Sequence, residues 1–147
     1  MPHVGLSLFA FLLSLFNSFT KEIPGAFLGN DARALRAYFA PGSYIQISLP
    51  APFNFSDQVS AEQAYLLFGR IFASAKTSGF YPEGDILPTV SRGSFIYKAR
   101  WEFLTTGRSP GAFRILFYVR GRPASRPGRG LWRITEIRAD RVGTGDP

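Results

Sequence analysis

The sequence contains no cysteine and only one histidine, His3. Without cysteine, the chain has no disulfide, no thiolate metal ligand and no thiol nucleophile. His3 precedes a long apolar run that we expect to lie outside the folded domain. Histidine is therefore excluded from that domain as a general base, a member of a catalytic triad or a metal ligand.

Loops that bind phosphate or calcium are absent from the sequence as well. The glycine- and arginine-rich stretch 121–128 lacks the Gly-Lys-Ser/Thr ending of a phosphate loop, and no aspartates recur at the spacing of a calcium loop. We therefore predict no metal site and no cofactor. Together with the missing cysteine and histidine, these absences favour a protein that is not an enzyme.

Three runs in the second half of the chain alternate between apolar and charged or polar residues. They cover residues 95–103, 113–119 and 132–138. Alternation with a period of two predicts strands with one packed face and one wet face. Three such runs in succession indicate an antiparallel sheet that needs a cover. A length of 147 residues, with 46% apolar residues and 15 phenylalanines, is enough for one domain with a filled core.

The cover is predicted from the first half of the chain, which contains the helical patterns. Short helices are expected over residues 20–28 and 31–40, the second capped by Asn30 or Asp31. A strand over 44–49 and a loop over 50–57 follow. Ser60 and Gln63 form a capping box that opens the main helix, which we expect to run to Ala75. Residues 80–90 are predicted to be irregular or an edge strand.

This order of elements predicts an α+β fold in which a curved antiparallel sheet wraps around a long helix, Ser60 to Ala75. Helices packed against one face of such a sheet leave a concave mouth, which is the usual place for a small ligand.

Residues 4–16 form an uncharged, apolar run of the length found in secretory signal peptides and too short to span a membrane. The alternative is a buried helix of the core. We expect residues 1–19 to be an export leader, 20–141 to be the domain and 142–147 to be a disordered tail. The protein is then periplasmic or extracellular, with no stable membrane span.

The positive charge of the chain lies in its second half. Residues 86–147 carry 12 basic and four acidic side chains, whereas residues 1–85 are nearly neutral. Between the last two strands, Arg122, Arg126 and Arg129 stand among glycine, proline and serine, which is a candidate anion-binding loop. The alternative is a solvated hairpin loop. We expect no nucleic-acid partner, because an exported protein rarely meets one.

The chain resembles the nuclear transport factor 2-like superfamily, whose members share a cystatin-like α+β cone. The resemblance rests on Gly29-Asn30-Asp31-Ala32-Arg33-Ala34-Leu35-Arg36-Ala37-Tyr38-Phe39, on the helix opening at residues 60–64 and on the closing strand 131–137. It covers residues 20 to 141 and is nearest to an exported bacterial group, domain of unknown function 4783. The superfamily includes isomerases, dehydratases and non-enzymatic binding modules, and many members pair through the sheet.

Aromatic side chains are the candidates for lining a ligand pocket, with plain core packing as the alternative. The pocket candidates are Tyr44, Tyr65, Phe68, Tyr97, Trp101, Phe117 and Trp132. Glu136 shares strand parity with Trp132 and Ile134, so it is expected to face inward, and it is the one weak candidate for a catalytic acid or base. The alternative for Glu136 is an ion pair with an arginine.

We therefore predict an exported, non-catalytic module that binds a small apolar ligand or a protein partner. Apolar residues on the outer parity of the strands (Ile96, Leu104, Leu116 and Tyr118) favour a partner, which includes a second copy of the chain. Two alternatives remain: an isomerase- or dehydratase-like enzyme that uses Glu136 or a pocket tyrosine, and an anion-binding module that uses the arginine-rich stretch 120–133.

Overall fold

The computed structural model describes residues 19–84, 93–122 and 131–142, so most of the predicted leader and tail lies outside the described residues. Residues 19–28 are helical. The elements that follow are α2 (Ala32–Arg36), β1 (Tyr44–Leu49), β2 (Phe55–Ser60), α3 (Ala61–Ser74), β3 (Ala75–Glu83), β4 (Ser94–Thr105), β5 (Pro110–Arg122) and β6 (Leu131–Arg141). The predicted α+β fold, a curved sheet with a long helix, is confirmed.

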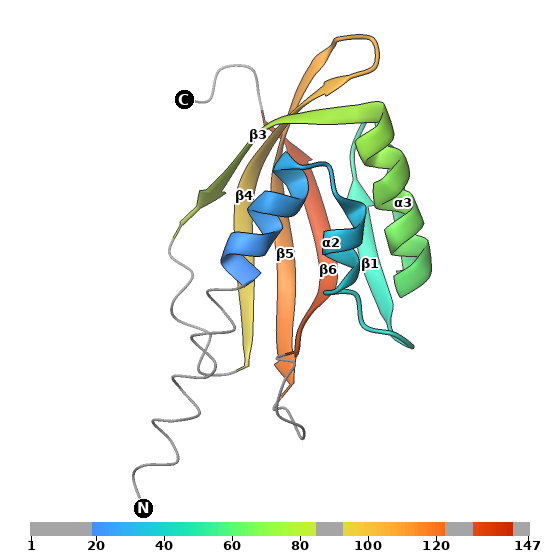
Figure 1. Cartoon of the computed structure of the whole chain (residues 1–147), viewed down its shortest axis with the longest axis vertical. Coiled ribbons are helices and arrows are strands. Elements are labelled where there is room, and N and C mark those ends of the chain that lie inside the picture. The colour runs from blue at the N-terminus through green and yellow to red at the C-terminus, as the bar shows by residue number, and fades with distance from the viewer. Residues whose placement is uncertain (1–18, 85–92, 123–130, 143–147) are drawn as a thin grey trace, which may run out of the picture.

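The strands form one six-stranded sheet in the order β2-β1-β6-β5-β4-β3, and the helices lie on one face of it (Figure 1). β4, β5 and β6 are antiparallel neighbours, as the three alternating runs predict. One pair differs from the prediction of a wholly antiparallel sheet, because β1 pairs with β6 in parallel. Pairing between strands so far apart in the chain leaves no local pattern, so the sequence does not reveal it.

Two boundaries also differ from the expectations. The predicted loop 50–57 ends early, since Phe55 opens the edge strand β2, in which only Val59 is buried. One inward side chain is too few to produce a period-two signal. The main helix, expected to run to Ala75, ends at Ser74, and β3 begins at Ala75 with no residue between them.

The helix caps that the sequence predicts are present. The Asp31 carboxylate accepts a hydrogen bond from the Ala34 amide and caps α2. At α3, the Ser60 hydroxyl accepts from the Gln63 amide, and the Gln63 side chain accepts from the Ser60 amide, which completes the capping box. These caps fix where each helix begins, and therefore which residues of α3 face the sheet.

The core lies between the helices and the concave face of the sheet. Phe27 stands at its centre, with ring centroids 4.7 to 6.2 Å from those of Phe68, Phe72, Phe80, Trp101 and Phe117. Every one of these rings is buried. Among the described residues, no polar or charged residue is buried.

Hydrogen bonds tie the turn after residue 28 to the sheet and the core. Asn30 has a positive φ of 50°, and its Oδ1 accepts from the Thr77 amide at 2.9 Å. The Thr77 hydroxyl in turn accepts from the Trp101 indole N–H at 2.9 Å. Asparagine is one of the few residues besides glycine that adopt positive φ readily, and here its side chain also has a partner.

Candidate functional site

The aromatic residues predicted to line a pocket do not form one site. Phe68, Tyr97, Trp101, Phe117 and Trp132 are buried in the core. Tyr44 is 72% exposed and belongs to the opposite face of the sheet, since its neighbour Ile45 is buried. Tyr65 is half-buried on α3, and the Arg36 guanidinium carbon lies 4.7 Å from its ring centre.

The five buried rings pack in the core among other aromatic rings. Phe53, from the turn between β1 and β2, stacks on Trp101 at 5.8 Å, and Tyr97 packs against Phe19, Phe80 and Phe117. The Tyr97 hydroxyl has no hydrogen-bond partner among the described residues. Burial raises the pKa of Tyr97 well above its usual range, so the phenol keeps its proton. A phenol in this state is not a base at neutral pH.

Glu136 lies on the open face of the sheet and not on the core face as predicted. The prediction assumes regular alternation along β6, and a bulge before Glu136 reverses that alternation. Tyr118 pairs with Glu136 and Val119 with Ile134, which leaves Thr135 as an extra residue. Ile134 and Ile137 are both buried, so Glu136 points away from the core. Its carboxylate forms an ion pair with Arg138 at 3.1 Å. An ion pair with an arginine is the alternative expected for Glu136 from the sequence.

Of the predicted anion-binding arginines, Arg126 and Arg129 lie outside the described residues. The backbone of Arg122 ends β5, opposite Leu131 of β6. The predicted loop therefore joins two long antiparallel strands, as expected.

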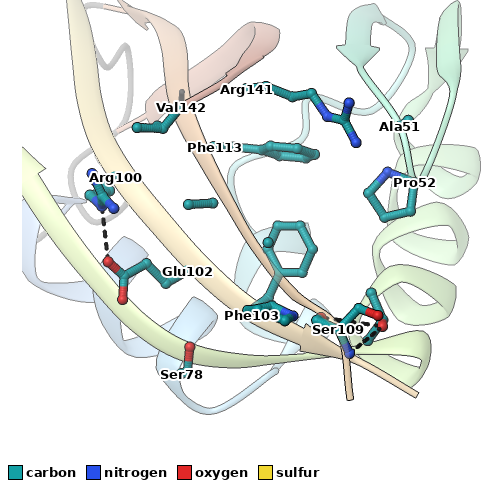
Figure 2. A pocket seen from close by; sticks show the side chains of 14 residues that line it. Ala51, Pro52, Ser78, Arg100, Glu102, Phe103, Ser109, Phe113, Arg141 and Val142 are labelled. Carbon is teal, nitrogen blue, oxygen red and sulfur yellow. Dashed lines mark hydrogen bonds and ion pairs between the residues drawn. The ribbon is translucent and has the colours of Figure 1, made fainter. Parts of the chain in front are cut away.

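A cleft of about 790 Å³ opens at the end of the sheet where three segments meet (Figure 2). These segments are the turn between β1 and β2, the turn between β4 and β5, and the end of β6. Its apolar lining includes Pro52, Phe103, Phe113 and Val142, and its polar lining includes Ser78, Arg100, Glu102, Thr105, Ser109 and Arg141. The sequence does not reveal this cleft, because the cleft forms where turns that are distant in the chain converge.

Three charged groups, Arg100, Glu102 and Arg141, distinguish the cleft from a purely apolar hollow. Arg100 and Glu102 satisfy each other in an ion pair of 2.9 Å. Arg141 is exposed and forms no ion pair with a described residue, and Figure 2 shows its guanidinium extending past the Phe113 ring toward Pro52. Phe113 and Arg141 are cross-strand partners in β5 and β6. The cleft thus combines apolar walls with one guanidinium that is open to a ligand.

The open face of the sheet carries a second feature, which we call the outer apolar patch: Ile96, Leu116 and Tyr118. Ile96 is 48% exposed and pairs across strands with Tyr118, and Leu116 lies two residues along the same face of β5. As predicted from strand parity, these residues and the exposed Leu104 face away from the core. Contiguous exposed apolar residues are typical of interaction surfaces.

Within the described ranges, no helix is both long and apolar enough to span a bilayer. The same residues contain no group of three or more histidine, cysteine or carboxylate side chains that is placed to hold a metal ion.

Comparison with solved structures places the fold among nuclear transport factor 2-like proteins. The chain is similar to a DUF4783 family protein from Bacteroides ovatus, with 19% identity, a TM-score of 0.57, and coverage of 83% of this chain and 94% of that one. It is also similar to a DUF4783 family protein from Bacteroides uniformis, with 16% identity, a TM-score of 0.59, and coverage of 84% and 96%.

A third similar structure is an NTF2-like protein from Cytophaga hutchinsonii, with 12% identity, a TM-score of 0.57, and coverage of 88% of this chain and 97% of that one. No family model and no curated protein matches the sequence. At these identities the likeness shows the fold, which confirms the resemblance drawn from the sequence, and leaves function to be argued from the sites.

Proposed function

We propose that the protein is a non-catalytic binding module that holds a small apolar molecule bearing one carboxylate group. The observation that carries this proposal is the cleft of about 790 Å³ at the end of the sheet. Small-molecule sites have volumes of about 300–1,000 Å³, with apolar walls and a few polar groups that orient the ligand. The ligand therefore lies outside the cone, whose interior is occupied by packed rings.

Arg141 is the residue that selects the carboxylate. Its guanidinium has no acidic partner among the described residues, and it lies beside the apolar surface of Phe113 and Pro52. Arginine matches a carboxylate through two parallel hydrogen bonds. An apolar chain can then lie against the exposed ring of Pro52, with its charged end at Arg141.

The supporting argument for a non-catalytic role is the chemistry of the interior. The tyrosine buried among the packed rings, Tyr97, keeps its proton, and the carboxylate expected to face inward, Glu136, is paired with Arg138 on the outside. General acid–base catalysis needs a proton donor or acceptor within reach of a substrate. In this arrangement, neither Tyr97 nor Glu136 offers a substrate a proton donor or acceptor within reach.

The first test is displacement of a fluorescent probe. Anilinonaphthalene sulfonate, an aromatic anion, is bound to the protein and displaced with dodecanoate or with the neutral dodecanol. We expect dodecanoate to displace the probe at lower concentration, and Arg141→Gln to weaken dodecanoate binding by about fivefold, the loss of one exposed charge-assisted contact.

The matched control is Arg70→Gln, which removes the same charge from an exposed position on α3 that does not line the cleft. Its affinity for dodecanoate should equal that of the unmodified protein. Equal affinities for dodecanoate and dodecanol, or a loss in Arg70→Gln as large as that in Arg141→Gln, would show that the cleft is not the site.

Export is a further part of the proposal and rests on the apolar run at residues 4–16. Phe19, which the sequence analysis assigns to the leader, is fully buried and packs against Tyr38, Phe95 and Tyr97. For this ring to remain in the core of an exported protein, the leader must be cleaved before residue 19. Amino-terminal sequencing of the protein from its native host locates that cleavage.

A second candidate function, self-association, is favoured by the outer apolar patch. The face around it carries an exposed cation, Lys98, and an exposed anion, Asp140, and neither forms an ion pair with a described residue. Two copies facing each other across a two-fold axis can pair opposite charges around an apolar centre. The partner proposed for this face is therefore a second copy of the chain.

This candidate predicts a dimer in solution that Ile96→Glu converts to a monomer, because a carboxylate in the middle of the patch would have to be desolvated. Sedimentation equilibrium measures the mass of both proteins. Leu66→Glu, on the exposed side of α3, is the control and should remain dimeric. A monomeric unmodified protein at high concentration would eliminate the candidate.

A further inference from the structure

Two arginines oppose each other across β5 and β6 at the end of the sheet that leads into the last hairpin. Arg120 and Arg133 are cross-strand partners. Val119, Trp132 and Ile134 are buried, so the alternation along each strand directs both arginines to the open face. Directly opposite residues have Cβ atoms about 4.5–5.5 Å apart, which brings the two guanidinium groups within reach of one bound group.

On this face, other arginines of β4, β5 and β6 that have an acidic residue nearby form ion pairs with that residue. The ion pairs are Arg100–Glu102, Arg114–Glu83 and Arg138–Glu136. Along β6, the acid closest in sequence to Arg133 is Glu136, and its carboxylate is engaged with Arg138. The remaining acid on β6, Asp140, lies seven residues from Arg133, roughly 20 Å along the strand.

Arg120 and Arg133 therefore form no ion pair with any described residue. Like charges placed directly opposite in a sheet are destabilising. The arrangement costs stability unless an anion lies between the two side chains. Packing against the core does not account for this arrangement, since Arg120 is exposed and Arg133 is only half-buried.

The surroundings indicate which anion fits. Ser94 of β4 is the cross-strand neighbour of Arg120 and adds a hydroxyl to the same row of the sheet. Two planar guanidinium groups and a hydroxyl present several N–H and O–H donors, and arginine matches phosphate oxygens in pairs. We propose that Arg120 and Arg133, with Ser94 beside them, bind a phosphate group. This site goes beyond the proposed function: it lies at the opposite end of β5 from the cleft.

Two sources can present this chemistry, a lipid headgroup and a free phosphate compound, and the experiment separates them. Binding is measured to phosphatidylcholine vesicles with and without phosphatidylglycerol, and to inorganic pyrophosphate by calorimetry. The test variant is Arg120→Gln with Arg133→Gln. It should lose at least about tenfold in affinity for whichever probe binds, because two charge-assisted donors are removed.

Two double variants serve as controls with the same loss of charge. Arg33→Gln with Arg70→Gln removes two exposed charges from the helices, and Arg126→Gln with Arg129→Gln removes two from the hairpin loop. Both should bind within about twofold of the unmodified protein, since salt screens charges that do not contact the bound phosphate. An equal loss of affinity in the helix variant would mean that net charge alone drives binding. A loss of affinity confined to the loop variant would place the site in the loop. Either result overturns the proposal.

Stability gives an independent readout. Because the two arginines repel each other in the free protein, their replacement should leave the midpoint of urea unfolding unchanged or raise it. A lower midpoint would assign them a structural role and contradict the proposal. Binding only to phosphatidylglycerol vesicles identifies a headgroup as the source, binding to pyrophosphate identifies a free phosphate compound, and binding to neither refutes the site.

Discussion

Replacement of Trp101 by alanine is expected to lower the free energy of unfolding by about 3–5 kcal/mol, the usual cost of deleting a large buried aromatic side chain. Trp101 has no exposed surface, and its indole contacts the rings of Phe27, Phe53, Phe72, Phe103 and Phe113. Domains of this kind are stable by about 5–15 kcal/mol, so the loss would be a large part of the total.

Urea unfolding followed by circular dichroism measures this loss without relying on tryptophan emission. Trp101→Phe keeps a ring in the same place but removes the hydrogen bond to Thr77, so it should cost less than Trp101→Ala. Leu66→Ala, on the exposed side of α3, is the control and should change stability by less than about 0.5 kcal/mol. A Trp101→Ala loss of the same size as the control would contradict a core built around this indole.

Replacement of Gly121 by alanine is expected to destabilise the protein by about 1–3 kcal/mol, the cost of overpacking a filled site. Gly121 pairs across strands with Trp132, and a Cβ atom at Gly121 would lie 2.6 Å from Cζ3 of that indole. The strand leaves room for the ring only because the glycine has no side chain. Thermal and urea unfolding of Gly121→Ala measure the effect.

The same substitution at Gly69 provides a control of opposite sign. Gly69 lies inside α3, and apart from its chain neighbours and the backbone of its own helix no atom stands within 4 Å of the position that a Cβ would take. Gly69→Ala should therefore stabilise the protein by about 0.5–1 kcal/mol, through helix propensity alone. In a double-mutant cycle, Trp132→Leu should remove most of the cost of Gly121→Ala. Additive effects in that cycle would show that the indole does not cover Gly121.

The fold was predictable where its signals are local. The capping box of Ser60 and Gln63 involves residues three positions apart, and the three long strands show their alternation over seven to nine residues each, so both follow from short-range rules. The strand β2 and the parallel pairing of β1 with β6 were not predictable. β2 lacks an alternating pattern, and the pairing of β1 with β6 is a contact between segments about 90 residues apart.

The candidate sites were less predictable, for a related reason. Aromatic residues that fill a core and those that line a hollow have the same sequence pattern, so Phe68 or Trp101 as a pocket residue could not be distinguished from a packing residue. Glu136 faces outward because of one bulge residue, Thr135, which no rule of alternation anticipates. The opposition of Arg120 and Arg133 depends on the register between two strands, and that register is set by the whole sheet.

The junction at Ser74 and Ala75 has a consequence for protein engineering. Because α3 passes into β3 with no connecting residue, an insertion, a fluorescent fusion or a backbone cut at this point would have to displace either the helix or the strand. The turn between Thr105 and Pro110 is exposed and joins antiparallel neighbours, so it is the natural position for splitting the protein into complementing fragments.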